Sequence, residues 1–240
     1  MQKDNSLEQK YNTSMIAKPF VKWAGGKTQL LTEIRKKYPD TIEKYCEPFV
    51  GGGAVLLDVL SNFQPEEVFI NDINKELINT YIQIRDNVSE LINMLSDLQK
   101  SFIELDSDNR KIMFLDKRKR YNELKIDTQN FGVEIASLFI FLNKTCFNGL
   151  YRVNKKGSFN VPMGAYKNPM ICDEKNLRNV SHLLKNVKIS CGDYKNCKNF
   201  IDTDTFVYID PPYRPLTATS SFTSYSKCEF GDKQQIELIA

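Results

Sequence analysis

The sequence predicts an α/β fold with a parallel sheet that is interrupted by a long insertion. Short apolar runs bounded by turn or polar residues are typical of buried strands. Four such runs occur, at 45–47, 68–70, 187–190 and 206–209. A triple glycine and a helical run over 54–60 separate the first two, which is the order of a βαβ unit. Asp72 and Asp210 are 138 positions apart, which far exceeds the roughly 30 residues of one further βαβ step.

The insertion is expected to be partly helical. Apolar residues at helical spacing predict one helix over 88–102 and a second over 132–142. The segment that follows, 146–169, is rich in Asn, Gly and aromatic residues and is typical of a hairpin with loops. The predicted domains are a first catalytic part, an inserted domain and a second catalytic part, at 1–74, 75–172 and 173–240.

Composition excludes several classes of protein. The 240 residues are 41% hydrophobic and 26% charged, which is ordinary for a globular protein and argues against disorder or a coiled coil. The most apolar stretch, 135–142, is too short to cross a bilayer. The first fifteen residues lack the apolar core of a signal peptide, so we expect a cytoplasmic protein.

Cysteine and histidine usage argues against a metal centre. No two of the six cysteines are spaced C-x-x-C, and the single histidine, His182, lies in a pattern typical of an amphipathic helix. We therefore expect scattered buried thiols and no metal. One histidine also leaves little room for histidine-dependent nucleophilic catalysis.

The charge distribution is more informative than the net charge of +3. Residues 110–172 carry 12 Lys and Arg against 4 Asp and Glu, whereas the rest of the chain is net acidic. A basic segment beside an acidic body favours an anionic polymer as partner. A solvated lysine-rich surface would give the same pattern.

The first motif is EPFVGGGAV, residues 47–55. Glycines after a strand let the backbone approach a cofactor closely. Asp72 follows the second predicted strand about 20 residues later, where a carboxylate can accept hydrogen bonds from ribose hydroxyls. This spacing favours a nucleoside-bearing cofactor. It does not match the dinucleotide fingerprint, because Leu56 stands where the third glycine would fall.

The second motif is KPFVKWAGGKTQLL, residues 18–31. Its Gly-Lys-Thr suggests a phosphate loop, but that loop needs a glycine where Val21 stands. Lys27 is instead an amine that can pair with a carboxylate, such as that of an amino-acid-like cofactor. Trp23, the single tryptophan, is either a core residue or an aromatic face beside a ring or a cation.

The third motif is Asp210-Pro211-Pro212-Tyr213, after the last predicted strand. This places it at the carboxyl edge of a parallel sheet, where ligands of α/β proteins bind. Prolines donate no N–H, so their carbonyls can face a ligand as acceptors. Asp210 and the Pro211 carbonyl could accept both hydrogens of an exocyclic amino group, and Tyr213 could stack on a base. A purely structural turn would have the same sequence.

Six motifs in this order resemble those of one family. They are KWAGGK, EPFVGGGAV, NDIN, NGLYRVN, FNVPMGAYKNP and DPPYRPLTATSSFTSY. Residues 18–240 resemble the α group of DNA adenine-N6 methyltransferases, above all the Dam-type and restriction–modification enzymes that methylate adenine in GATC. The resemblance implies a Rossmann-like sheet that uses S-adenosylmethionine, with an inserted, mainly helical DNA-recognition subdomain and a β-hairpin. It also implies double-stranded DNA as substrate, base flipping, and a cognate restriction endonuclease as one partner.

The resemblance implies a role for individual residues. The cofactor contacts that it implies are Trp23, Lys27, Phe49, Gly51, Gly53, Asp72, Asp193 and Asp210. The DNA contacts that it implies are Lys22, Phe147, Asn148, Leu150, Arg152, Pro162 and Tyr166. The catalytic residues that it implies are Asp210, Pro211, Pro212 and Tyr213, and no metal is needed.

One departure from the family concerns the end of the chain. Family members continue for some tens of residues beyond this point, whereas 233–240 reads as the start of a helix without a C-cap. We therefore expect a C-terminally truncated chain whose sheet keeps an open edge.

Alternative functions stay open at this stage. A cytosine-N4 or an RNA adenine methyltransferase would present the same exocyclic amino group to this pocket, although the GATC-type insertion argues against both. An inactive DNA-binding fragment would retain DNA without turnover. A nucleotide-hydrolysing enzyme is disfavoured, because the phosphate loop is missing.

Overall fold

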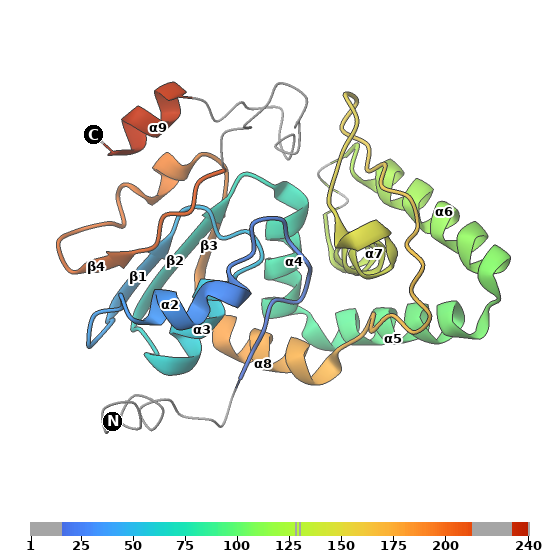
Figure 1. Ribbon diagram of the computed structural model, residues 1–240, viewed down its shortest axis with the longest axis horizontal. Coiled ribbons are helices and arrows are strands. Elements are labelled where there is room, and N and C mark those ends of the chain that lie inside the picture. Colours follow the sequence, from blue (N-terminus) through green and yellow to red (C-terminus); the bar gives the residue numbers. More distant parts are fainter. Residues whose placement is uncertain (1–15, 128, 130, 213–231, 240) are drawn as a thin grey trace.

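The computed structural model describes residues 16–127, 129, 131–212 and 232–239 (Figure 1). A parallel sheet of four strands forms the centre of one half of the molecule. The strands are β1 (Lys44–Glu47), β2 (Glu67–Asp72), β3 (Lys188–Cys191) and β4 (Thr205–Val207). Their spatial order is β3-β2-β1-β4, and every pairing is parallel. The predicted α/β class with a parallel sheet is therefore confirmed, and each strand lies within about two residues of its predicted range.

Helices pack beside the sheet because this buries their apolar faces. The helices of this half are α2 (Leu31–Arg35), which follows the short η1 (Thr28–Leu30), α3 (Ala54–Asn62), α4 (Lys75–Asp86), α8 (Glu174–Leu184) and α9 (Asp232–Ile239). Every residue of α3 from Ala54 to Leu60 is buried, so this helix packs as part of the core. In α4, Asn74 caps the N-terminus by accepting a hydrogen bond from the Leu77 amide at 2.9 Å.

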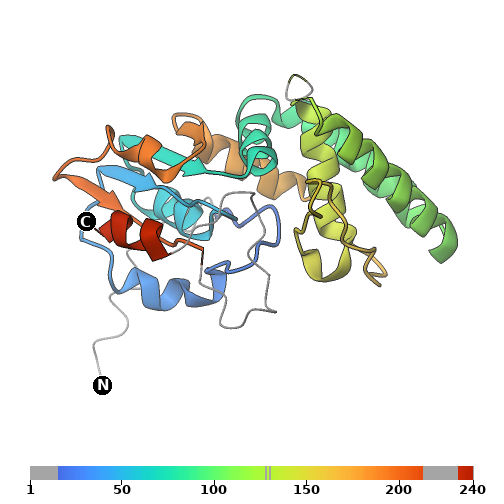
Figure 2. The ribbon, with the colours of Figure 1, turned by 90° about the horizontal axis from the view of Figure 1, so that it is seen from above.

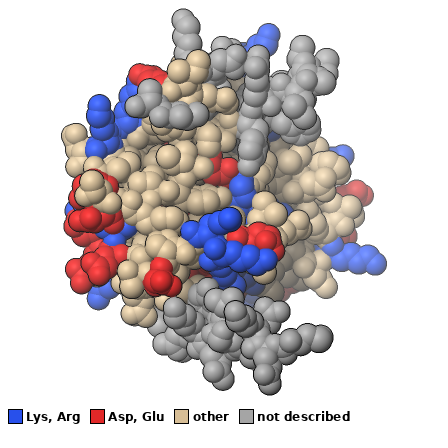
Figure 3. Space-filling view, turned by 60° about the vertical axis from the view of Figure 1, so that its left-hand side comes forward, with Lys and Arg blue, Asp and Glu red and all other residues tan. Residues whose placement is uncertain are grey.

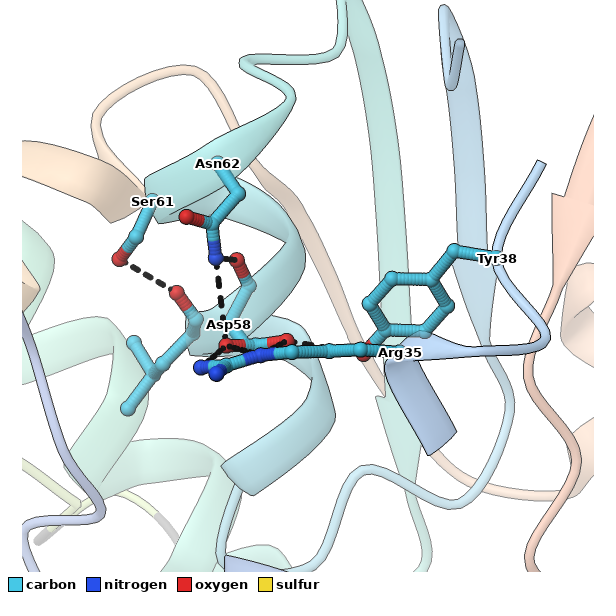
Figure 4. Close-up of polar contacts among 6 residues, drawn as sticks. Arg35, Tyr38, Asp58, Ser61 and Asn62 are labelled. Carbon is cyan, nitrogen blue, oxygen red and sulfur yellow. Dashed lines mark hydrogen bonds and ion pairs between the residues drawn. The ribbon is translucent and has the colours of Figure 1, made fainter. Parts of the chain in front are cut away.

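Asp58 is the charged residue within this buried stretch of α3, and it is fully paired (Figure 4). Its carboxylate accepts hydrogen bonds from the Arg35 guanidinium and from the Tyr38 hydroxyl, the latter at 3.1 Å. Asn62 donates to the same carboxylate at 3.2 Å. Burial and the Asp58 charge raise the pKa of Tyr38, so its hydroxyl stays a donor. This cluster fixes α2 and the following turn on α3.

A helical half lies beside the sheet (Figures 1 and 2). It contains α5 (Val88–Glu104), α6 (Ser107–Leu124) and α7 (Val133–Thr145). The two helices predicted over 88–102 and 132–142 are confirmed as α5 and α7, with small extensions. Helix α7 contacts α4, α5 and α6, so it joins the two halves of the molecule.

Helix α6 is not among the predicted helices, and its sequence explains why. Only Phe114, Tyr121 and Leu124 are buried, so the apolar pattern is too sparse to indicate a helix. Its start is nevertheless well defined, because the Asp106 side chain accepts a hydrogen bond from the Asn109 amide at 2.9 Å. In both views α6 extends along the outer side of the helical half (Figures 1 and 2).

The predicted hairpin follows α7 and is looser than a regular β-ribbon. It starts with a short η3 turn (Phe147–Gly149) and contains two isolated antiparallel bridges, Cys146 with Met163 and Val153 with Phe159. Asn122 of α6 holds this hairpin from the side, because it bonds both the amide and the carbonyl of Phe159, at 2.7 and 3.1 Å. The arrangement is therefore a hairpin held by side chains of α6 rather than by a continuous ladder.

The described cysteines differ in part from the predicted scatter of buried thiols. Cys46, Cys146 and Cys197 are buried, but Cys191 is exposed and Cys172 is partly exposed. Cys46 and Cys197 are neighbours, since the Cys197 thiol and burial together raise the pKa of Cys46. Cys228 lies outside the described residues.

Surface charges on the side where β4 lies are mixed. Figure 3 looks at the molecule from this side, and Lys and Arg alternate there with Asp and Glu around a broad area of other residues. Two exposed apolar residues flank β4, Ile201 and Ile209. Within the described ranges, none of the helices combines the length and the apolar character that a membrane span requires.

Candidate active site

The carboxyl ends of the four strands meet at one edge of the sheet, and a predicted motif follows each of them. The glycine motif follows β1, NDIN closes β2, Cys191-Gly192-Asp193 follows β3, and the Asp210 motif follows β4. In a parallel sheet this edge is where ligands bind. The fold therefore brings together motifs that are up to about 160 residues apart in the sequence.

Two residues of the glycine loop need to be glycine. Gly51 and Gly53 have φ values of +48° and +72°, which L-residues rarely adopt. A Cβ on Gly51 would lie 2.9 Å from Cδ1 of Trp23, and one on Gly53 would lie 2.3 Å from the hydroxyl of Tyr81. That hydroxyl donates a hydrogen bond to the Gly51 carbonyl at 3.0 Å. The loop is thus held between Trp23 and Tyr81, and sequence reasoning missed Tyr81.

Asp72 holds the glycine loop from the end of β2. Its carboxylate accepts hydrogen bonds from the amides of Gly51 and Asn74, at 3.0 and 2.9 Å. Burial raises the pKa of Asp72, while these two hydrogen bonds oppose the shift. The contact with a ribose that the sequence predicts is compatible with this role, because each carboxylate oxygen has a further lone pair.

Asn71, the neighbour of Asp72, connects the loops after β1 and β3. Its side-chain amide donates to the carbonyls of Pro48 and Gly192, at 3.2 and 3.0 Å. Its Oδ1 is buried and has no hydrogen-bond partner among the described residues. A buried acceptor of this kind is costly unless a further group supplies a donor.

Lys27 and Asp210 form an ion pair that joins the second motif to the third. Their side chains are only 12% and 21% exposed, and Lys27 also donates to the Gly25 carbonyl at 2.9 Å. Pro211 and Pro212 follow at the edge of the sheet. Tyr213 and the remainder of its motif lie outside the described residues.

Glu47 is a further carboxyl group at this edge, and sequence reasoning missed it. It is 3% exposed, and Tyr45 donates a hydrogen bond to it at 2.8 Å. Burial raises the pKa of Glu47 to about 8, and the charges of Asp210 and Asp72 act in the same direction. The signal that could have revealed it is its position, as an acidic residue between a buried strand and a glycine loop.

Phe49 and Asp193 lie at the other end of this edge. The Phe49 ring stacks on Tyr194, with 5.6 Å between the ring centroids. Asp193 is exposed and begins the short η4 turn (Tyr194–Cys197), where it accepts a hydrogen bond from the Lys195 amide at 2.9 Å. Both residues lie beside the strand ends, as a cofactor contact requires.

The predicted DNA-contacting residues form a second group, centred on Lys22. The Lys22 ammonium donates to the Tyr166 hydroxyl at 3.2 Å and lies 4.8 Å from the centroid of its ring. The Lys22 stem packs so closely on Gly149 that a Cβ there would lie 2.5 Å from it. The structure therefore brings together an N-terminal residue and the hairpin.

Asn143 of α7 holds this group in place, and sequence reasoning missed it. Its side chain accepts a hydrogen bond from the Lys22 amide at 2.8 Å and donates to the carbonyls of Lys22 and Gly149, both at 2.9 Å. A buried asparagine at the end of an apolar run is a signal for such a tertiary hydrogen bond.

The remaining predicted DNA contacts lie along the hairpin. Phe147 is 52% exposed on a tight turn in which Asn148 has a φ of +54°. Its amide donates to the Pro162 carbonyl at 2.9 Å. Leu150 packs against the core, and Arg152 is exposed and donates to the Asn160 side chain at 2.8 Å.

The comparisons with known proteins show the family of this chain. Residues 23–240 match the family model described as D12 class N6 adenine-specific DNA methyltransferase. The chain belongs to the D12 class of N6 adenine-specific DNA methyltransferases. The resemblance drawn from the six motifs is therefore confirmed at the level of the family, as is the predicted Rossmann-like methyltransferase fold.

Three relatives of this D12-class methyltransferase illustrate the similarity. The type II methyltransferase M.MjaIII of Methanocaldococcus jannaschii is 52% identical over 93% of this chain and 78% of its own length. The type II methyltransferase M1.LlaDCHI of Lactococcus lactis subsp. cremoris is 41% identical over 92% and 74%. The DNA adenine methylase of Haemophilus influenzae is 39% identical over 91% and 71%.

Proposed function

We propose that this methyltransferase transfers a methyl group from S-adenosylmethionine to N6 of adenine in double-stranded DNA, at GATC, after flipping the adenine out of the helix. The observation that carries the proposal is the Lys27–Asp210 ion pair at the carboxyl edge of the sheet. It joins a residue proposed to hold the cofactor to the residue proposed to hold the target amino group.

The chemistry of the pocket fits S-adenosylmethionine. The charges of Asp72 and Asp210 both act on the Glu47 carboxyl group at this edge, and a sulfonium cation suits such acidic surroundings. When bound, this cofactor supplies an electrophilic methyl group. The residues that we propose to hold it are Trp23, Lys27, Phe49, Gly51, Gly53, Asp72, Asp193 and Asp210.

The proposed catalytic step depends on accepting hydrogen bonds from the amino group. The N6 lone pair of adenine is delocalised into the ring, so the amino group is a poor nucleophile. Acceptance of both N–H groups, by Asp210 and the Pro211 carbonyl, favours a more pyramidal nitrogen whose lone pair can attack. The N6–methyl bond forms as the sulfur–methyl bond breaks. N6 then releases one proton, and Asp210 is the group that we propose accepts it. Holding the two reactants together lowers the activation barrier by several kcal/mol, with ~7–11 kcal/mol as the value reached in ideally oriented reactions.

DNA recognition is assigned to the Lys22 group and the hairpin. Flipping a base costs a few kcal/mol, and stacking of the base on an aromatic ring such as Tyr213 recovers about 1–3 kcal/mol. The exposed Phe147 and Asn148 on their tight turn are suited to enter the gap that the flipped base leaves. We propose Lys22, Leu150, Arg152 and Pro162 as readers of base edges, with Tyr166 near the backbone.

A restriction endonuclease of the same specificity is the partner we propose. Two of the similar proteins are named type II methyltransferases. Others are named DNA adenine methylases, so a role without an endonuclease is the alternative.

The decisive experiment combines labelled cofactor with matched DNA. The chain is incubated with methyl-labelled S-adenosylmethionine and duplexes that differ only in GATC or GTTC, and the products are digested to nucleosides. We expect label in N6-methyladenine from the GATC duplex alone. Label in methylcytosine would overturn the base assignment, and equal label from both duplexes would overturn the site.

A pair of matched variants assigns the chemistry to Asp210. Asp210→Asn should abolish transfer. Asp202→Asn changes an exposed aspartate at the opposite end of β4, which pairs with Lys44 at 2.6 Å, and should retain transfer. Near-normal turnover of Asp210→Asn would contradict the proposed mechanism.

A further inference from the structure

Tyr151 of the hairpin packs on Trp23, the residue that covers the glycine loop. Its ring is 7% exposed and stacks on Trp23, with 5.6 Å between centroids and 29° between planes. Trp23 also contacts the glycine loop, since a Cβ on Gly51 or Gly52 would lie within 3.0 Å of the Trp23 side chain. A single aromatic side chain thus separates the hairpin from the proposed cofactor loop.

A buried lysine holds Tyr151 in this position. The Lys125 ammonium, at the end of α6, donates to the Tyr151 hydroxyl at 3.0 Å and to the Gly157 carbonyl at 3.1 Å. It also pairs with Glu76 of α4 at 2.6 Å, and the two side chains are only 10% and 13% exposed. All three ammonium protons therefore have a partner, two in the hairpin and one in α4.

The two contacts end beside two loops at the carboxyl edge of the sheet. Glu76 lies in the first turn of α4, directly after the NDIN motif that contains Asp72. Trp23 packs on the loop to which Asp72 is bonded at 3.0 Å. The hairpin is therefore connected to this edge by two contacts, the aromatic stack of Tyr151 on Trp23 and the ion pair of Lys125 with Glu76. A buried ion pair contributes little net stability, so its geometry is the more informative property.

We propose that Lys125 and Tyr151 are positioning residues that couple DNA binding at the hairpin to cofactor binding at the glycine loop. The proposal rests on the proposed function, because it needs both ligands. Coupling is reciprocal, so DNA must tighten cofactor binding by the same factor by which the cofactor tightens DNA binding. Typical coupling factors lie between about 5 and 150.

Trp23 supplies the probe, because the chain has a single tryptophan. The affinity for S-adenosylhomocysteine is measured from Trp23 fluorescence, without DNA and with a saturating GATC duplex. In the wild type we expect the duplex to tighten binding about fivefold or more. Tyr151→Leu, which removes the stacked ring, should bring this ratio to within twofold of one. An unchanged ratio in this variant would overturn the proposal.

Two further variants separate position from stability. Tyr151→Phe keeps the ring and loses the hydroxyl, so it should retain part of the coupling. Phe102→Leu changes a buried ring that packs on Phe141, away from Trp23, and should keep the wild-type ratio. The double variant Lys125→Met/Glu76→Gln removes the ion pair without leaving a buried charge, and should reduce the ratio at least twofold. Equal ratios in this variant and the wild type would contradict the role of Lys125.

A measurement without ligands distinguishes failure of this proposal from failure of the proposed function. Hydrogen exchange of the Gly51 and Gly53 amides is compared in the wild type, Tyr151→Leu and Phe102→Leu. We expect exchange to be about tenfold faster in Tyr151→Leu alone, because the loop loses its support. Should the wild type bind neither ligand, the proposed function fails and this comparison still decides whether the hairpin supports the loop. Exchange within twofold of the wild type in Tyr151→Leu would overturn the proposal.

Discussion

Replacing Gly53 with alanine should destabilise the protein through one defined collision. Gly53 has a φ of +72°, and its new Cβ would lie 2.3 Å from the hydroxyl oxygen of Tyr81. Tyr81 is fully buried, so its hydroxyl cannot move into solvent. The ring would have to shift and give up the hydrogen bond from its hydroxyl to the Gly51 carbonyl, which measures 3.0 Å.

The size of the effect follows from two contributions. A left-handed conformation costs an L-residue about 1–2 kcal/mol. Loss of the hydrogen bond from Tyr81 costs about 1–3 kcal/mol, because the hydroxyl stays buried without a partner. We therefore expect Gly53→Ala to lower the free energy of unfolding by ~2–5 kcal/mol.

Urea denaturation followed by circular dichroism measures this change, and two matched variants separate its parts. Gly157→Ala has a similar φ, +83°, with no atom within 4 Å of the new Cβ, so it reports the conformational cost alone. In a Tyr81→Phe background the nearest ring atom, Cζ, is 3.3 Å away, so Gly53→Ala should cost ~1–3 kcal/mol less than in the wild type. If Gly53→Ala lowers the free energy of unfolding equally in the two backgrounds, the proposed collision with the Tyr81 hydroxyl is refuted.

Three further predictions concern hydrogen bonds, base readout and pH. Asn143→Ala should destabilise the fold by about 3 kcal/mol in urea and weaken DNA binding, because the Lys22 amide and carbonyl lose their partner; unchanged DNA affinity would show that Lys22 keeps its place without it. Arg152→Ala should relax base preference at one position by about 1–3 kcal/mol in competition binding; a uniform loss across sequences would make Arg152 a phosphate contact. The pKa of Glu47, raised to about 8, means that the unfolded chain releases this proton at lower pH than the folded chain. Stability should therefore fall as pH rises from about 4.5 to 8, by up to ~5 kcal/mol, and Glu47→Gln should remove this fall in urea midpoints; parallel curves for the two proteins would refute the burial argument.

The sheet and its loops were predictable because their signals are local. A buried strand such as Tyr45–Glu47 is a short apolar run, and the glycine loop follows it immediately. The order of the strands in space was not predictable, because β3 and β4 pair with β2 and β1, which lie more than 100 residues earlier in the sequence. Parallel pairing of such distant segments is settled by tertiary packing.

The missed residues share a property that sequence patterns hide. Tyr81, Asn143 and Lys125 each act on a segment that lies between 26 and 121 residues away. In the sequence each is one polar or amphipathic residue on a helix, which the apolar pattern treats as background. Their roles become visible only when the atom that each donates to, or accepts from, is known. Glu47 differs, because its position between strand and glycine loop is a local signal.

The segment 18–27 joins the two proposed ligand sites and has no regular structure. Two asparagines bond its backbone as a neighbouring strand would. Asn176 of α8 accepts a hydrogen bond from the Lys18 amide and donates to the Lys18 carbonyl, both at 2.9 Å. Asn143 of α7 does the same for Lys22, at 2.8 and 2.9 Å. A carboxamide that bonds both groups of one residue reproduces the pairing of a β-bridge.

These two anchors lie four residues apart on a chain that continues into Trp23 and Lys27. Because buried backbone groups need partners, they let an irregular segment run between α7 and α8 without a ladder. The segment can then present Lys22 to the hairpin and Trp23 to the glycine loop from adjacent positions. A regular strand would turn these successive side chains to opposite faces of one sheet, whereas here they serve two different elements. The irregular backbone is therefore what allows one short segment to contact both proposed ligand sites.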